Sequence, residues 1–428
     1  MATTHRLTRM PRLPVAVAGL LALGLAAACT PGGGGGDGGG DGEGPIELVW
    51  ALGGAEAQPG GVHQVITEMW NEENDDVQVR IEILPEAADQ QREQHALELQ
   101  AESSTFDILG VDVIWTGEYS ENGWLESLED VRGDIESVTL PGPFESALWG
   151  DELWAAPYNS NAGMLLYRTD LVDEPPTTWD EMCEMAVQAS EEAGIAGYVA
   201  QGARYEGFVV NWLELYWSAG GELYNEDQTE VLFDVDIATE VTQWLSDARE
   251  SGCLAPGFNT SQEEEARNEF QSGNAVFQRN WPYVYSLLLE DGGEVSENFD
   301  IAPLPTFTGE GTISALGGFN NAVSAFSDHT EEAKEFVVWL STDEDVQRTL
   351  ATEGSVPPTM ASVYDELSDD PVMALLGEIL EDARPRPPSP AWNEISVEMQ
   401  RALFDAYNGE ADPRQAAEQV RTFLEGTI

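Results

Sequence analysis

The residues with the clearest chemical potential are aromatic side chains beside short polar ones, in four segments that lack helical or strand periodicity. The segments are Asp112-Val113-Ile114-Trp115, Pro157-Tyr158-Asn159-Ser160-Asn161, Asn280-Trp281-Pro282-Tyr283 and Gly317-Gly318-Phe319-Asn320. This mixture suits a sugar, because the C–H faces of a sugar stack on aromatic rings and its hydroxyls need carboxylate, amide and guanidinium partners. One such segment alone is more typical of a protein core. The four together predict a carbohydrate site.

Motifs for common catalytic and metal sites are absent: the sequence has no HExxH, CxxC, GxSxG or GxxxxGK[ST]. Its four histidines, at positions 5, 63, 95 and 329, are scattered along the chain. We therefore expect no metal, no cofactor and no His-based triad. The alternative from a different class is a secreted glycoside hydrolase, whose paired carboxylates could be Glu56 and Asp112. Release of sugar from trehalose, maltose or longer glucans would identify that activity.

Strand and helix patterns alternate from residue 45 onwards and restart after Pro157, which predicts an α/β protein with parallel sheets. Apolar runs and alternations predict strands at 46–50, 77–83, 106–109, 275–277 and 301–305. Helical spacing predicts helices at 62–70, 90–103 and 237–248. The capping boxes Thr178-x-x-Glu181 and Ser341-x-x-Glu344 each predict a helix start.

Two further helical segments favour structural over functional roles. Trp212, Tyr216 and Trp217 share one segment and are more typical of a core than of a ligand site. The run 263–265, three consecutive glutamates, predicts a solvated helix face.

The N-terminal segment has the composition of an export signal. Three arginines precede an apolar run from Leu13 to Ala28 that is short for a membrane-spanning helix. Ala26-Ala27-Ala28-Cys29 resembles the lipobox of bacterial lipoproteins, although that pattern prefers Leu at the place of Ala26. We predict a signal peptide at 1–28, lipidation of Cys29 and a flexible Gly-rich tether to 44, which together anchor the protein on the extracellular face of the cell membrane. The alternative is an ordinary signal peptide with an incidental cysteine.

The charge of the chain excludes several partners. The 428 residues include 79 acidic and 18 basic ones, for a formal net charge of -61. Such a field repels phosphate backbones and anionic headgroups, so we expect no nucleic-acid binding and membrane contact only through the lipid. Acidic side chains over the surface would keep the protein soluble, and in a saline habitat salt would screen their mutual repulsion. Capture of a cationic ligand such as a polyamine is the alternative, but charge spread over the entire chain defines no site.

Two cysteines, Cys183 and Cys253, remain after the lipidation site. Export would place them in an oxidising compartment, where they either form a disulfide or remain two buried thiols.

From about residue 46 to the C-terminus, the chain resembles the extracellular solute-binding proteins of the maltose-binding type that serve ABC importers, in particular their trehalose/maltose-binding lipoproteins. The segments that carry the resemblance are 51–56, 111–115, 123–126, 157–163, 166–168, 217–221, 280–282, 302–305, 316–318 and 384–387. Their order and spacing over about 380 residues make the assignment specific.

The resemblance implies a two-lobed α/β fold, each lobe a mostly parallel sheet flanked by helices, with hinge crossings and a sugar in the cleft. It implies a first lobe at 45–156 plus about 304–352 and a second lobe at about 157–303 plus 353–428. The protein would be a monomeric, non-catalytic receptor that delivers trehalose, maltose or a related α-glucoside to the transmembrane permease subunits. Another oligosaccharide or a polyol is the alternative ligand.

The resemblance also implies site residues. Asp112 and Glu56 would accept hydrogen bonds from sugar hydroxyls, Trp281 would stack on a sugar ring, and the backbone of Gly317 and Gly318 would approach another ring. The alternatives are that Glu56 is a solvent-exposed loop acid, that Asp112 only caps the next turn and that Trp281 is a core anchor.

Four more positions complete the predicted site. Tyr158 and Asn159 belong to the same segment as Asn161, which stands where some relatives use Asp. Phe319 stands where relatives often place Trp, and Arg386, or alternatively Arg384, would close the site.

Overall fold

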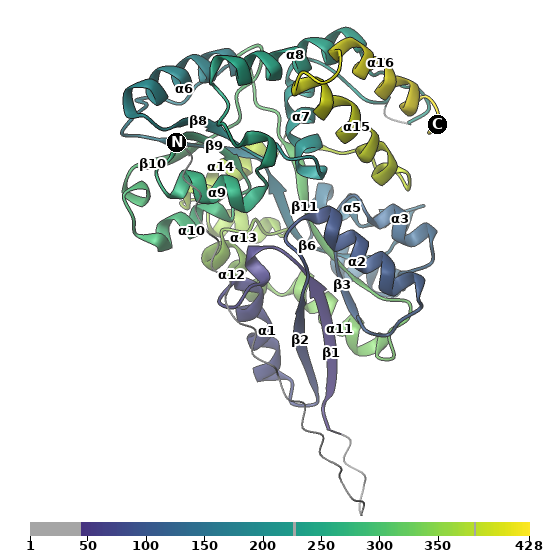
Figure 1. Ribbon diagram of the computed structural model, residues 1–428. Helices are drawn as coiled ribbons and strands as arrows, with labels where there is room; N and C mark the ends of the chain where they lie inside the picture. Colours follow the sequence, from purple (N-terminus) through teal and green to yellow (C-terminus); the bar gives the residue numbers. More distant parts are fainter. Residues whose placement is uncertain (1–43, 226–227, 381) are drawn as a thin grey trace, which may run out of the picture. The chain divides into compact units, whose positions relative to one another are not determined.

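The computed structural model describes residues 44–225, 228–380 and 382–428 (Figure 1). The predicted signal peptide, the lipidation of Cys29 and all of the tether except Gly44 lie outside the described residues. Two larger sheets, each covered by helices, form the predicted two-lobed α/β fold (Figure 1). None of the described helices combines the length and the apolar character that a membrane crossing requires.

The first sheet has the order β12-β11-β3-β1-β2, with β6 also paired to β11. Its strands are β1 (Ile46–Leu52), β2 (Val77–Ile83), β3 (Ile108–Asp112), β6 (Ala156–Ala162), β11 (Ala315–Val323) and β12 (Arg384–Pro385). As the sequence predicted, β1 is parallel to β2 and β3, because α1 (Val62–Glu73) and α2 (Ala88–Gln100) supply the crossovers. By contrast, β11 is antiparallel to both β3 and β6.

The second sheet has the order β10-β7-β9-β8 and is less parallel than predicted. Its strands are β7 (Met164–Arg168), β8 (Ala196–Val199), β9 (Ala275–Asn280) and β10 (Phe299–Ala302). Only β8 and β9 are parallel, whereas β7 is antiparallel to both β9 and β10. The reason is that β7 follows β6 after Gly163 alone, so the crossing between the lobes, not a helical crossover, sets its direction.

Helices divide between the lobes by their contacts. On the first lobe, α11 contacts β6 and β11, α12 contacts α1, and α12, α13 and α14 contact one another in sequence. The first-lobe helices after α2 are α3 (Thr116–Glu121), α4 (Arg132–Glu136), α5 (Pro141–Ser146), α11 (Thr330–Thr342), α12 (Glu344–Gly354), α13 (Ala361–Glu366) and α14 (Pro371–Ile379). A short hairpin, β4 (Leu148–Trp149) and β5 (Glu152–Leu153), follows α5.

On the second lobe, α15 and α16 pack on α7 and α8 (Figure 1). The helices of this lobe are α6 (Trp179–Ala193), α7 (Glu206–Ser218), α8 (Val235–Ser251), α9 (Glu263–Gln271), α10 (Val284–Asp291), α15 (Trp392–Tyr407) and α16 (Pro413–Leu424). We propose lobe bounds of 45–162 plus 315–385 and of 163–302 plus 392–428. Compared with the bounds expected from the sequence, this moves β6, α13, α14 and β12 to the first lobe.

The two capping boxes have different outcomes. The Thr178 side chain accepts the Glu181 backbone N–H at the start of α6, as predicted. The prediction for Ser341 is wrong: α11 continues to Thr342, and Asp343 caps α12 by accepting from the N–H groups of Asp345 and Val346. Ser341 is buried and its hydroxyl has no partner among the described residues, so it cannot replace the carboxylate of Asp343.

The sequence left two features of the second lobe undecided, the pairing of its cysteines and the role of the aromatic residues of α7. Cys183 on α6 and Cys253 after α8 form a disulfide, with their Cα atoms 5.0 Å apart. The aromatic residues of α7 belong to the core: Trp212 and Tyr216 are fully buried and stack with ring centroids 4.9 Å apart.

Candidate functional site

All ten residues that the sequence assigned to a ligand site line one cavity of about 120 Å³. They are Glu56, Asp112, Tyr158, Asn159, Asn161, Trp281, Gly317, Gly318, Phe319 and Arg386. The first lobe contributes β3, β6, β11 and the short helix after β1, η1 (Ala55–Ala57). The second lobe contributes α7, α9 and the segment after β9. The cavity is thus a cleft between the two lobes.

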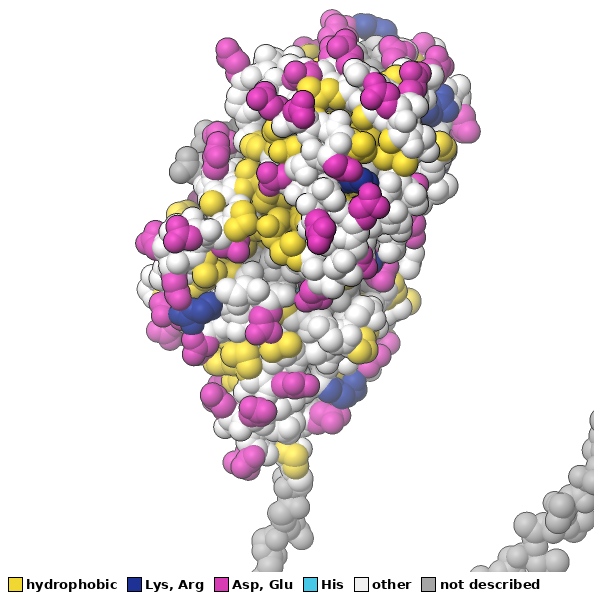
Figure 2. All heavy atoms as spheres, turned by 90° about the vertical axis from the view of Figure 1, so that its left-hand side faces the viewer, with side chains coloured by type: hydrophobic (Ala, Val, Ile, Leu, Met, Phe, Trp, Pro, Cys, Tyr) yellow, Lys and Arg dark blue, Asp and Glu magenta, His cyan; other side chains and the backbone are white. Residues whose placement is uncertain are grey.

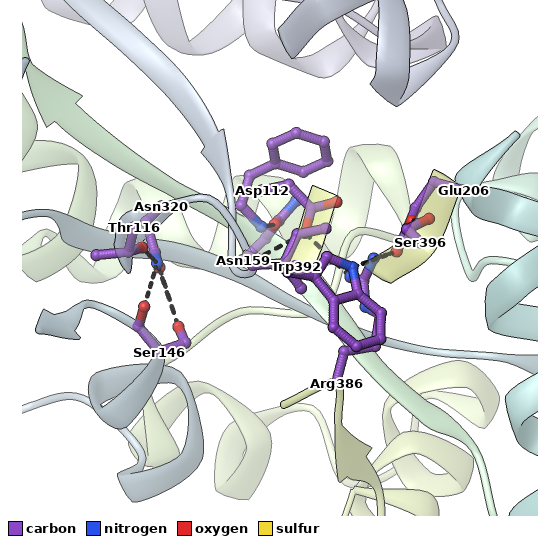
Figure 3. Close-up of polar contacts among 11 residues, drawn as sticks. Asp112, Thr116, Ser146, Asn159, Glu206, Asn320, Arg386, Trp392 and Ser396 are labelled. Carbon is purple, nitrogen blue, oxygen red and sulfur yellow. Dashed lines mark hydrogen bonds and ion pairs between the residues drawn. The ribbon is translucent and has the colours of Figure 1, made fainter. Parts of the chain in front are cut away.

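Arg386 joins the walls of this cleft. Its guanidinium donates to Asp112 Oδ1 at 3.0 Å and to Glu206 Oε1 at 2.7 Å, which ties β3 of the first lobe to α7 of the second (Figure 3). Glu206 also accepts from Trp392 Nε1 at 2.9 Å and from the Ser396 hydroxyl of α15. Burial raises the pKa of Asp112 above its usual range, and the charge of Arg386 opposes that rise. The alternative residue, Arg384, instead pairs with Glu222 outside the cavity.

A β-bulge directs Tyr158 towards the cleft. Pro157 pairs with Asn320 and Asn159 with Phe319, so Tyr158 is the additional residue of β6 at this point. Bulges commonly redirect a side chain, and here Tyr158 and its neighbour Asn159 both line the cavity. No periodic pattern in the sequence marks this irregularity.

Gly318 permits a close approach of β11 to β6. Its φ is 122°, and a Cβ atom there would clash with the backbone carbonyl of Asn159. The same Asn159 accepts the Phe319 N–H through Oδ1 at 2.6 Å, which fixes its amide in the cleft wall. This close packing is between β11 and β6, and the predicted approach of the Gly317 and Gly318 backbone to a sugar ring stays a prediction.

Trp281 directly follows β9, an inner strand of the second sheet, and is partly exposed to the cleft. The Arg279 guanidinium lies over its ring at 4.1 Å from the centroid. Arg279 is fully buried and pairs through Nε and Nη2 with Glu214 of α7, at 2.9 and 2.5 Å. A side chain at Gly163 would clash with this pair, so the pair, the hinge crossing and the indole are packed together.

The sequence analysis missed acidic groups from the second lobe. Glu263 and Glu264, in the first turn of α9, are half-buried in the cleft wall, and only Glu265 is exposed as the sequence predicted for all three. Glu206 also lines the cleft. Three consecutive acids at a helix start are usually solvated, and nothing in the local sequence shows that α9 faces the other lobe.

Several buried polar groups of the cleft have no partner among the described residues. They include the Tyr158 hydroxyl, both ring nitrogens of His63 and Nε of Arg386. Glu56 is half-buried, and burial, with the charges of Glu264 and Glu263, raises its pKa to about 7. Buried groups without partners are costly, so the cleft is prepared for a ligand with many hydrogen-bonding atoms.

A second, larger cavity of about 690 Å³ lies on the opposite face of the first sheet. Ser160 and Leu316 line it, whereas their neighbours Asn161 and Gly317 line the cleft, as strand alternation requires. Asn320 points away from the cleft and donates to Ser146, a residue of the larger cavity (Figure 3). Of the ten predicted residues only Arg386 reaches both cavities, so the smaller one is the candidate site.

The chemistry of the cleft is that of binding by hydrogen bonds and ring contacts. Across residues 44–225, 228–380 and 382–428, no group of three His, Cys, Asp or Glu side chains is arranged to hold a metal ion. Carboxylates, amides, tyrosine hydroxyls and one guanidinium surround a partly exposed indole.

Comparison with known proteins agrees with this architecture. Residues 54–347 match the model of the bacterial extracellular solute-binding protein family. A probable ABC transporter-binding protein of Deinococcus radiodurans is 30% identical over 359 residues, covering 79% of this chain and 84% of the relative. A maltotriose-binding protein of Pyrococcus abyssi is 24% identical over 315 residues, covering 71% of this chain and 65% of the relative.

Among solved structures, maltose-bound MalE3 of T. maritima is 31% identical, with a TM-score of 0.83, and covers 90% of this chain and 100% of its own. The unliganded and acarbose-bound receptor GacH of Streptomyces glaucescens has a TM-score of 0.80 at 20% identity and covers 90% of this chain and 99% of its own, which supports the fold alone. The chain belongs to the bacterial extracellular solute-binding protein family, a family of binding receptors and not of enzymes.

Proposed function

We propose that the protein is the sugar receptor of an ABC importer, which captures a small α-glucoside such as trehalose or maltose in the cleft and delivers it to the permease. The observation that carries the proposal is the meeting of all ten predicted residues, from both lobes, in one cavity. Closure around the ligand would bury it, and the closed pair of lobes would present one surface to the permease.

The side chains support a sugar over other small solutes. Trp281 offers one indole face for stacking, because Arg279 occupies the other. Asp112, Glu56, Asn159 and Asn161 supply acceptors and amide donors for hydroxyl groups. The pattern of aromatic and polar groups is that expected of carbohydrate sites.

The relatives support the choice of an α-glucoside. MalE3 is bound to maltose at 31% identity, and the Pyrococcus relative is named for maltotriose. Other similar structures hold α-D-tagatose or ribitol, at 22% and 18% identity. A different sugar or a polyol is therefore the second candidate.

A thermal-shift screen tests the proposal. The panel contains trehalose, maltose, maltotriose, tagatose, ribitol and spermidine, the last as the cationic alternative. A bound sugar should raise the melting temperature in proportion to ln(1 + [L]/Kd), because the unfolded chain does not bind it. If trehalose and maltose have no effect at millimolar concentration, the α-glucoside assignment is wrong. A response to spermidine alone contradicts a sugar receptor.

Anchoring by a lipid on Cys29 is part of the same proposal, since an importer receptor must stay near its permease. The full-length chain with Cys29→Ser should be released from cells into the medium, while the native chain stays in the membrane fraction. Equal release of both chains contradicts the anchor.

A further inference from the structure

The cleft is lined by many more negative than positive groups. Among the described residues that line it, Arg386 is the only one with a positive charge, and the carboxylates are those of Glu56, Glu86, Asp112, Glu206, Glu263 and Glu264.

Most of these carboxylates are compensated or solvated. Arg386 pairs with Asp112 and Glu206. Glu264 pairs with Arg267 at 2.5 Å and accepts the Tyr283 hydroxyl at 2.8 Å. Glu86 is exposed to solvent. Glu56 and Glu263, both half-buried, form no ion pair with any described residue; burial raises the pKa of Glu263, and Tyr205 and the charge of Arg279 oppose that rise.

An independent group points to the same end of the cleft. The Tyr158 side chain is 1% exposed, lines the cavity next to Glu56, and its hydroxyl has no hydrogen-bond partner among the described residues. His63 is 5% exposed and its two ring nitrogens also lack partners. A buried hydroxyl and a buried imidazole without partners indicate that an additional polar group belongs there.

We propose that this end of the cleft, formed by Glu56, Glu263 and Tyr158, receives a protonated amine, so that the preferred ligand is an amino sugar and not its neutral parent. The inference rests on the proposed function, because it assigns one substituent of the captured sugar.

An ammonium group matches this end of the cleft in its hydrogen-bond donors and in its charge. An ammonium group has three donors and no acceptor, and it meets two carboxylates and a tyrosine oxygen. A neutral hydroxyl would leave the half-buried Glu56 without a counter-ion and Glu263 with only the charge of Arg279 beyond ion-pair distance, which is costly. The raised pKa of Glu56, caused by burial and by the neighbouring Glu264 and Glu263, reflects that uncompensated charge.

Calorimetry with matched ligands tests the inference at near-neutral pH and physiological salt. The pairs are D-glucosamine with D-glucose, and 2-amino-2-deoxytrehalose with trehalose, and N-acetyl-D-glucosamine is the uncharged control. In at least one pair the amine should bind about 10- to 100-fold more tightly than its parent, the ratio that a hydrogen bond to a charged group provides. Acetylation should remove the advantage.

Variants connect the effect to the proposed residues. Glu56→Gln and Glu263→Gln should each reduce the preference for the amine, while binding of the neutral parent changes less. Glu269→Gln, an exposed acid on the same helix, should leave the preference unchanged. Because both tested glutamates lack ion-pair partners, the Gln variants should melt no lower than the native protein, and the melting curve shows whether they fold.

The outcomes separate the two proposals. If neutral sugars bind and the amines bind no better, or if the preference survives in both Gln variants, the amine site is wrong and the sugar receptor stands. If neither the sugars of the screen nor the amines bind, both proposals fail.

Discussion

Asp112 lines the cleft and accepts a hydrogen bond from Arg386, so its carboxylate serves both the proposed ligand and the contact between the lobes. We expect Asp112→Ala to weaken sugar binding by about 1.5–3 kcal/mol, the range for a hydrogen bond to a charged group. Asp112→Asn is the control for charge, because its amide oxygen still accepts the Ile114 N–H. Calorimetry measures both variants. Unaltered affinity in Asp112→Ala would remove this residue from the site.

Trp281 is partly exposed, which distinguishes it from a core tryptophan. If Trp281 is a stacking platform, the Trp281→Ala protein should lose most of its affinity for the sugar and only a little stability. If Trp281 is a core anchor, the variant should lose about 3–5 kcal/mol of stability. Trp244, a half-buried tryptophan of α8 outside the cleft, is the matched control: Trp244→Ala should lose stability and keep affinity. A Trp281→Ala protein that binds sugar normally contradicts the platform.

The raised pKa of Glu56 predicts that the stability of the protein depends on pH. Its pKa of about 7 in the folded chain exceeds the ordinary value of 4.5, so the folded state holds the proton more tightly and stability falls as pH rises from 4.5 towards 7. Glu56→Gln should therefore raise the free energy of unfolding by about 1–3 kcal/mol near pH 8 and leave it nearly unchanged near pH 4. Urea titrations at both pH values measure the difference. An equal effect at both values would show that ionisation of Glu56 is not the cause.

At the scale of elements, the disulfide joins α6 to the segment after α8 across 70 residues of sequence. Mass spectrometry of the alkylated, non-reduced protein should show no added groups on Cys183 and Cys253. The double variant Cys183→Ser/Cys253→Ser should lose about 2–4 kcal/mol of stability in urea, because the unfolded chain loses a constraint. Two alkyl groups on the native protein would mean that the bridge does not form.

The hinge strands explain how the lobes reach one site. β6 and β7 are almost one extended segment, and β11 pairs with β6, so residues far apart in the sequence lie side by side at the crossing. The same arrangement makes β7 antiparallel to β9 and β10, because a strand that crosses between lobes takes its direction from the first sheet. The predicted cap of α6 is Thr178, as the local sequence indicates. The cap of α12 lies two residues after the predicted Ser341, at Asp343, because α11 continues past Ser341 to Thr342.

At the scale of the molecule, acidic side chains are spread over the visible face with few basic ones among them (Figure 2). With a net charge of -61, repulsion should destabilise the folded state, and salt shortens its range from about 10 Å at 0.1 M to about 3 Å at 1 M. We expect the melting temperature to rise between these sodium chloride concentrations. Sucrose of equal osmolality is the control. A larger rise in sucrose than in salt contradicts the electrostatic explanation.

The sequence by itself determined the strands β1 and β2, the helix of Val62, the two-lobed family and nine of the ten predicted residues that line the cleft, all except the choice of Arg386 over Arg384. These features depend on local periodicity or on motifs that keep their order along the chain. It also marked the aromatic residues of α7 correctly as core.

Only the tertiary structure decided which of Arg384 and Arg386 enters the cleft, that Tyr158 sits on a bulge, and that Glu263 and Glu264 of α9 line the cavity. The local sequence of a run of glutamates is the same whether the run lies on a solvated helix face or in the wall of a cleft. What distinguishes the two is the opposite lobe, which the hinge strands β6 and β11 bring near, so that Glu263 becomes half-buried in the cleft wall.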